Sequence, residues 1–130
     1  MSQQAIEVIL TRQLAAHLSM PTFLVDADGR VLHYNEAAKR ALGDRLEQER
    51  DVTARELAAL FETRDQKGNP VPAEALPIVV ALEERHPAHA RLRVVGSQGR
   101  EVDVAVTAIP LVGQGRRFLG AIAFFWEVPA

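Results

Sequence analysis

The stretch TFLVDADGRVLHYNEAA, residues 22–38, decides how the first part of the chain folds. Thr22–Val25 and Val31–Tyr34 are short apolar runs with the β-branched and aromatic residues that strands favour. Asp28-Gly29 lies between them and is a strong turn signal. The side chain of Asp26 can accept hydrogen bonds from the amides of that turn. The stretch therefore predicts a β-hairpin.

Helices fill the middle of the chain. Asn35 is a suitable N-cap for the first of them, which starts directly after the hairpin. Pro77 is tolerated only in the first turn of the last one, because proline has no N–H to donate inside a helix. The predicted segments are a helix over 36–42, two short helices within 44–62, a loop over 63–73 and a helix over Glu74–Arg85.

The last third of the chain changes to a strand period. Ala88–Val95, Glu101–Ile109 and Arg117–Val128 are separated by short segments that contain glycine, which is typical of an antiparallel meander. With the first hairpin this makes five strands. The sequence predicts an α+β fold, with a five-stranded antiparallel sheet and the helices inserted between strands 2 and 3.

An amphipathic helix over residues 3–19 precedes this unit. Its apolar stripe needs a covering surface, which is either the chain's own sheet or the same helix of a second copy. Pro21 ends the helix. We therefore divide the chain into a covering or dimerisation helix, residues 1–20, and a domain, residues 21–130. The stripe consists of Ile6, Leu10, Leu14 and Leu18.

Composition excludes several classes of protein. The chain has 130 residues, about the size of one domain, and 48% of them are hydrophobic. It has no cysteine, which removes disulfides, thiolate metal sites and thiol nucleophiles. A net charge of −2 argues against nucleic-acid binding, and no apolar run is long enough to span a membrane. We expect a cytoplasmic protein.

The order of several short motifs resembles that of a PAS domain, over about residues 20–127. This resemblance implies a sensory or signalling module with a ligand cavity between sheet and helices. Family members that feed an effector domain often end in an Asp-Ile-Thr-like exit, whereas this chain reads FFWEVPA at 124–130, so the N-terminal helix is the expected output element. The motifs are FLVDADGRV (23–31), YNEAA (34–38), DQKGNP (65–70), Leu76-Pro77, Gly99-Arg100, IPL (109–111) and FLGA (118–121).

Strand alternation sorts the sheet into two faces. By resemblance to PAS domains, one face lines the cavity, although its side chains could equally be ordinary core. The last strand is apolar on both faces, so its second face needs the covering helix described above. The candidate cavity residues are Phe23, Val25, Leu92, Val94, Val104, Val106, Ile122 and Phe124, together with Ala108. The candidate interface residues on the opposite face are Leu119, Ala121, Ala123 and Phe125.

The sequence argues against most PAS cofactors. A flavin or chromophore attached through cysteine is excluded, and the apolar inner strands offer no polar groups to a non-covalent flavin. His86 and His89 lie roughly where haem-binding PAS domains carry their ligand, but a solvated helix end explains them better. Asp26 and Asp28 lack the further oxygen ligands of a calcium loop, so we expect no metal.

Two functions remain. The first is a PAS-type sensory or regulatory module, a homodimer through its N-terminal helix, that binds a small apolar ligand or a signalling partner or effector domain. The second is an interaction and dimerisation domain without a ligand. A small α+β enzyme is the weakest hypothesis, because no serine, histidine or carboxylate stands in a catalytic pattern.

Overall fold

In the part of the chain that the structure describes, five strands form one antiparallel sheet in the order β2-β1-β5-β4-β3. The computed structural model describes residues 6–42, 52–56, 61–95 and 99–128. The strands are β1 (Thr22–Asp26), β2 (Val31–Tyr34), β3 (Ala88–Val95), β4 (Glu101–Val112) and β5 (Phe118–Glu127). The helices are α1 (Ile6–His17), α2 (Glu36–Leu42), α5 (Pro77–Glu83) and the 3-10 turns η1 (Ala54–Glu56), η2 (Ala73–Ala75) and η4 (Gln114–Arg116). The predicted α+β fold is confirmed, and α2, η1, η2 and α5 lie between β2 and β3 as expected.

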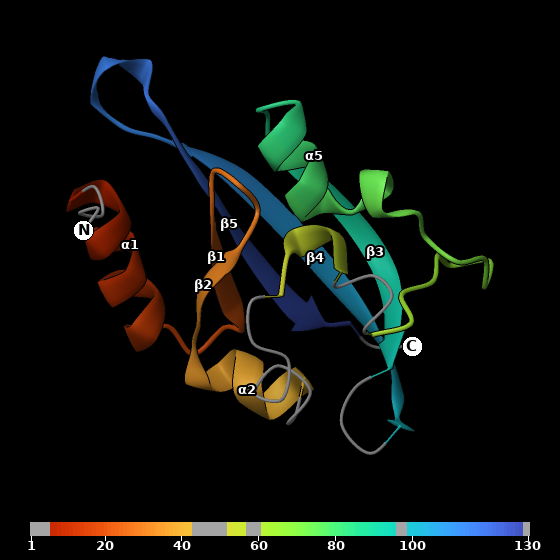
Figure 1. Cartoon of the computed structure of the whole chain (residues 1–130). Helices are drawn as coiled ribbons and strands as arrows, with labels where there is room; N and C mark the ends of the chain where they lie inside the picture. The colour runs from red at the N-terminus through yellow and green to blue at the C-terminus, as the bar shows by residue number, and fades with distance from the viewer. Residues whose placement is uncertain (1–5, 43–51, 57–60, 96–98, 129–130) are drawn as a thin grey trace.

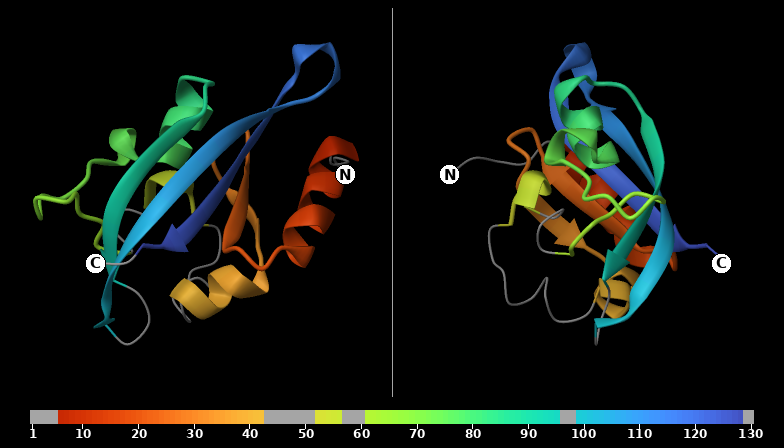
Figure 2. Two further views of the ribbon diagram at one scale, coloured as in Figure 1. Left: turned by 180° about the vertical axis from the view of Figure 1, so that it is seen from behind. Right: turned by 90° about the vertical axis from the view of Figure 1, so that its right-hand side faces the viewer.

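The two faces of the sheet carry different helices. Figure 1 shows α5, η1 and η2 on one side and α1 on the other, and the view from behind in Figure 2 agrees. The main hydrophobic core lies between the sheet and α5, and a smaller apolar cluster lies between the sheet and α1. None of the helices in the described ranges is long and apolar enough to cross a membrane.

The β1–β2 turn forms as the sequence predicts. The Asp26 carboxylate accepts hydrogen bonds from the backbone N–H groups of Asp28, at 2.9 Å, and Arg30, at 3.0 Å. Gly29 has φ of 86°, a conformation that glycine adopts without steric cost. The carboxylate of Asp26 thus acts as a turn acceptor. No group of three or more residues able to hold a metal ion occurs within the described ranges.

Asn35 is a buried junction as well as the predicted helix cap. Its side-chain oxygen accepts hydrogen bonds from the N–H of Ala38, at 2.9 Å, and from that of Thr22, at 3.1 Å. Its side-chain nitrogen donates to the carbonyl oxygens of Met20, at 2.8 Å, and Leu18, at 3.2 Å. One side chain therefore joins the start of α2, the start of β1 and the segment that leaves α1.

Helix α5 begins later than predicted. Its first residue is Pro77, where the missing N–H costs nothing. The residues before it, Ala73–Ala75, form the separate turn η2 instead of a first helical turn. Of the two short helices predicted within residues 44–62, only the region of η1 and the residues at 61–62 fall in the described ranges.

The prediction for the faces of β5 is wrong by one residue. Ala121 and Ala123 pair with Val25 and Phe23, so they lie with Phe125 on the α5 side of the sheet. Ile122 and Phe124, predicted to line the cavity, lie on the α1 side. A shift of one residue in a strand exchanges its two faces, and both faces of β5 are apolar, so alternation alone could not fix the phase.

A β-bulge at Gly120 explains why Leu119 does not follow this pattern. Gly120 pairs with Leu111 and Phe118 with Val112, so Leu119 is an extra residue in β5. Leu119 therefore stays on the α1 side although Ala121, two residues on, does not. The glycine is required here, since its φ is 142° and an added Cβ would lie 2.0 Å from the Val25 carbonyl oxygen.

Helix α1 covers the sheet with a different side from the one predicted. Val8 is buried and packs against Leu24 and Ile122. The predicted stripe instead points outward, with Ile6, Leu10 and Leu14 exposed by 67%, 57% and 60%, while Leu18, just beyond the helix, is half-buried. The contact of Val8 with Leu24 and Ile122 decides which side of α1 faces the sheet. Leu10, two residues after Val8, lies about 200° around the helix from it and therefore points outward.

Candidate functional site

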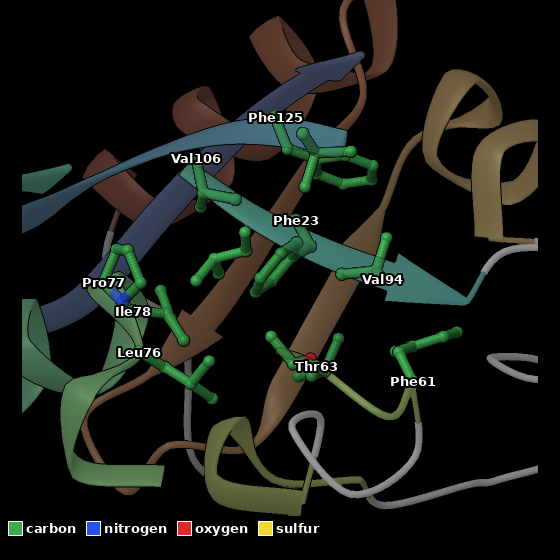
Figure 3. A pocket seen from close by; sticks show the side chains of 12 residues that line it. Phe23, Phe61, Thr63, Leu76, Pro77, Ile78, Val94, Val106 and Phe125 are labelled. Carbon is green, nitrogen blue, oxygen red and sulfur yellow. The ribbon is translucent and has the colours of Figure 1, made fainter. Parts of the chain in front are cut away.

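An apolar pocket lies between the sheet and the start of α5. Figure 3 shows side chains from the strands on one side of it and from residues 61–63 and 76–78 on the other. Phe23 and Phe125 form an aromatic pair in its wall, with ring centroids 6.2 Å apart and planes inclined by 55°. The centre of a water-sized sphere can move through about 80 Å³ of this pocket. A single water needs only about 10–15 Å³, so the pocket has room for a larger molecule.

The segment Phe61–Arg64 closes one side of the pocket because it is attached to the edge of the sheet. The backbones of Arg64 and Arg93 exchange two hydrogen bonds of 2.8 Å, and the N–H of Val95 donates to the carbonyl of Phe61. This strand-like pairing turns Phe61 and Thr63 inward, where each is about 5% exposed, and leaves Glu62 outside.

Most of the predicted cavity residues lie in the pocket wall. Phe23, Leu92, Val94, Val104 and Val106 line it. Val25 is buried in the surrounding core, with 1% of its surface exposed. Ile122 and Phe124 lie on the other face of the sheet, as described above.

Sequence reasoning missed the other half of the wall. Phe125 was assigned to the wrong face, and the remaining residues come from outside the three long strands. Inward alternation at Phe61 and Thr63, and the apolar turn that starts α5, were the available signals. The missed residues are Val31, Phe61, Thr63, Leu76, Pro77, Ile78 and Phe125.

The profile of the PAS fold matches residues 10–128 of this sequence. The chain belongs to the PAS family. PAS domains are in general sensory modules, and they commonly mediate protein interaction and dimerisation. The pocket described above is thus the cavity of a PAS domain, and α1 lies on the opposite face of its sheet.

Solved structures with the same fold include three of different origin. The PAS domain of Bordetella pertussis BvgS is 18% identical, with a TM-score of 0.65 over 95% of this chain and 87% of that one. A Rhodobacter sphaeroides LOV protein is 16% identical, with a TM-score of 0.72 over 96% and 69%. Phage VqmA, in a complex with DPO, is 14% identical, with a TM-score of 0.66 over 94% and 53%. No curated protein matches the sequence.

The histidines considered as haem ligands lie away from the PAS pocket. His86 is exposed, 3.6 Å from Glu84, and its Nδ1 lies 2.9 Å from the carbonyl oxygen of Pro87. Both contacts, the backbone contact first, raise the pKa of His86 above its ordinary value of 6.5. Nδ1 of His89 lies 2.7 Å from the Thr107 hydroxyl, and its ring packs on Trp126. Both contacts lie on the outer face of the sheet, which is the face away from α5. Neither histidine lines the pocket.

Two charged contacts hold the elements around the pocket together at the surface. Arg55 of η1 pairs with Glu83 of α5 and with Glu74 of η2, the latter at 3.3 Å. These carboxylates, Glu83 first, raise the pKa of Arg55 above its already high value. Because all three side chains are exposed, these ion pairs contribute little to the stability of the fold.

Proposed function

We propose that this PAS domain is a sensory or regulatory module that binds a small apolar ligand in the pocket. Occupation of the pocket would shift the packing of the sheet against α1, and α1 would pass this change to a second copy or to a signalling partner. Residues 1–20 are then the output unit and residues 21–130 the sensing unit, in the cytoplasm. We assign the protein no catalytic role.

The arrangement of β1 and β5 carries this proposal. Phe23 and Phe125 line the pocket, and their neighbours Leu24 and Phe124 belong to the cluster under α1. A strand turns successive side chains to opposite faces, so a ligand that displaces β1 or β5 also displaces the surface on which Val8 packs. The ligand must favour one packing over the other to shift their populations.

Binding of a ligand in the pocket can be tested directly. Freshly purified protein is analysed by native mass spectrometry and by an absorbance scan, and toluene is then titrated while the methyl signals of Val94, Val104 and Ile78 are followed by NMR. A retained ligand, or shifts confined to these pocket methyls, supports the proposal. Absence of both a retained molecule and toluene-induced shifts refutes it.

The step from pocket to α1 needs its own measurement. The chain has no cysteine, so Gln13→Cys on the exposed side of α1 gives one site for a spin label. Toluene should change the mobility of this label, but not that of a label at Gln66→Cys in an exposed loop. If toluene binds and the α1 label does not respond, the output part of the proposal is wrong.

A ligand-free dimerisation domain is the second candidate function. The observation that favours it is the exposed apolar side of α1, formed by Ile6, Ile9, Leu10 and Leu14. Large exposed apolar patches on soluble proteins commonly mark interaction sites. This surface also fits the homodimer in the first proposal, so the oligomeric state and the ligand are tested separately.

Leu10→Asp tests the dimer directly. A carboxylate buried between two helices without a partner is costly, so we expect this variant to sediment as a monomer when the wild type sediments as a dimer. Gln66→Asp adds the same charge in an exposed loop and should leave the dimer intact. A wild type that remains monomeric at high concentration, or a dimer unaffected by Leu10→Asp, refutes assembly through α1.

A further inference from the structure

The hydroxyl group of Thr63 is a polar exception in the apolar pocket. Thr63 lines the pocket with 6% of its surface exposed, and its side chain makes no hydrogen bond with any described residue. Figure 3 shows its oxygen among the carbon atoms of the neighbouring side chains. The Thr63 oxygen is not a fully buried atom, because part of its surface faces open space. A ligand that covers this hydroxyl without a hydrogen-bonding group leaves it unpaired, which costs free energy, whereas a ligand with a matching group avoids that cost.

The backbone around Thr63 holds this hydroxyl in place. The carbonyl of Thr63 accepts a hydrogen bond from the N–H of Val71, at 3.1 Å, and the next residue, Arg64, is paired to Arg93 of β3. The backbone of Thr63 is thus fixed on both sides. A β-branched side chain also has few rotamers, so the hydroxyl position is well defined before any ligand arrives.

The rest of the wall limits what can bind. Among the described residues that line the pocket, Thr63 is the one with a polar side chain, and none is charged. An ionised ligand would lose its hydration without gaining a counter-charge, which is strongly unfavourable. A ligand with several polar groups would leave all but one of them unpaired.

We propose that the pocket takes an uncharged, mainly apolar molecule of about one ring, whose single hydrogen-bonding group meets Thr63 Oγ1. This rests on the proposed function, in which the pocket binds a ligand. A threonine hydroxyl both donates and accepts, so the group on the ligand is a hydroxyl, a carbonyl or an ether oxygen. An apolar cavity lined by aliphatic and phenyl side chains is known to hold a benzene ring.

Phenol and toluene provide a matched pair of probes, because they differ by a hydroxyl in place of a methyl group. The affinity of each is measured by NMR titration for the wild type and for Thr63→Val, which keeps the shape of the side chain but removes the hydroxyl. We expect the ratio of phenol to toluene affinity to fall by about threefold to tenfold in Thr63→Val, as the loss of one hydrogen bond implies. Thr107→Val, on the outer face, should leave the ratio unchanged.

The outcomes separate the two proposals. If neither probe binds the wild type, ligand binding in the pocket fails and this inference fails with it. If both bind and the ratio is the same in Thr63→Val, pocket binding stands and the role of Thr63 is refuted. Should Thr63→Val not fold, the pair Thr63→Ser and Thr63→Ala is compared, and only the serine variant is expected to keep the wild-type ratio.

Discussion

Replacing Asn35 by alanine tests the junction on which the position of α1 depends. Among the described residues, the wild-type side chain makes hydrogen bonds to three different segments, two as acceptor and two as donor. Alanine makes none of them. The substitution creates no large cavity and introduces no charge, so its effect reports on these hydrogen bonds.

The expected loss of stability follows from which partners stay buried. Thr22 and Ala38 are each 0% exposed, so their N–H groups lose an acceptor where water cannot replace it. Each such loss costs about 1–3 kcal/mol. The carbonyl of Met20 keeps the hydrogen bond from the Thr22 hydroxyl, at 2.8 Å, and Leu18 is half-buried, so these two groups add less. We expect a total of about 3 kcal/mol, or roughly 10 °C in Tm for a domain of this size.

Thermal unfolding followed by circular dichroism measures the total, and hydrogen exchange of the α1 amides measures the local effect. Both should change in Asn35→Ala. Asn69→Ala, at an exposed turn position, is the control and should unfold close to the wild type. A fall in Tm of less than about 3 °C would contradict the burial argument. A full fall with unchanged exchange in α1 would show that Asn35 stabilises α2 alone.

Two further substitutions test other parts of the fold. Gly120→Ala should destabilise the domain by more than about 4 kcal/mol, because its Cβ would collide with the Val25 carbonyl. Gly115→Ala is the control: this glycine has φ of 69° and no atom within 4 Å of an added Cβ, so the change should cost about 1 kcal/mol. Urea unfolding measures both free energies. Equal effects would exclude the collision. The backbone N–H of Glu7 itself is the largest cause that lowers the pKa of the Glu7 carboxyl below 4.5, and the N–H of Gln114 is the second. The contact of α1 with η4 should therefore persist above pH 4.5 and be lost as the pH falls through the lowered pKa. Hydrogen exchange of α1 against pH measures this, and Glu7→Gln should abolish the pH dependence.

Local signals in the sequence predicted the fold well. The limits of β2 and β3, the Asp26 turn and the Asn35 cap all agree with the structure, because each depends on neighbouring residues alone. The site was predicted in part, since β3 and β4 have one apolar and one charged face that fix their phase. β5 has no such contrast, and the bulge at Gly120 depends on a close approach of β1 that no local pattern encodes.

The wall opposite the sheet was harder to predict for a related reason. Phe61 and Thr63 point into the pocket only because the backbone of Arg64 pairs with Arg93, some thirty residues further along the chain. The outward direction of Leu10 has a similar origin. It follows from the burial of Val8 against Ile122, a contact between the two ends of the chain.

Beside the packing of Val8, two hydrogen-bonded contacts of unlike chemistry join α1 and the residues that follow it to the rest of the described domain. Near its end, the carbonyls of Leu18 and Met20 bind the buried, uncharged amide of Asn35. Near its start, an exposed carboxylate, that of Glu7, binds the N–H of Gln114 at 3.0 Å. The first contact has no titratable group, whereas the second is weakened when the Glu7 carboxylate is protonated, so its loss would let α1 tilt about the end held by Asn35. Glu7 lies about 16 Å from Leu18 along the helix axis, and a tilt of roughly 10° moves the Glu7 end by about 3 Å.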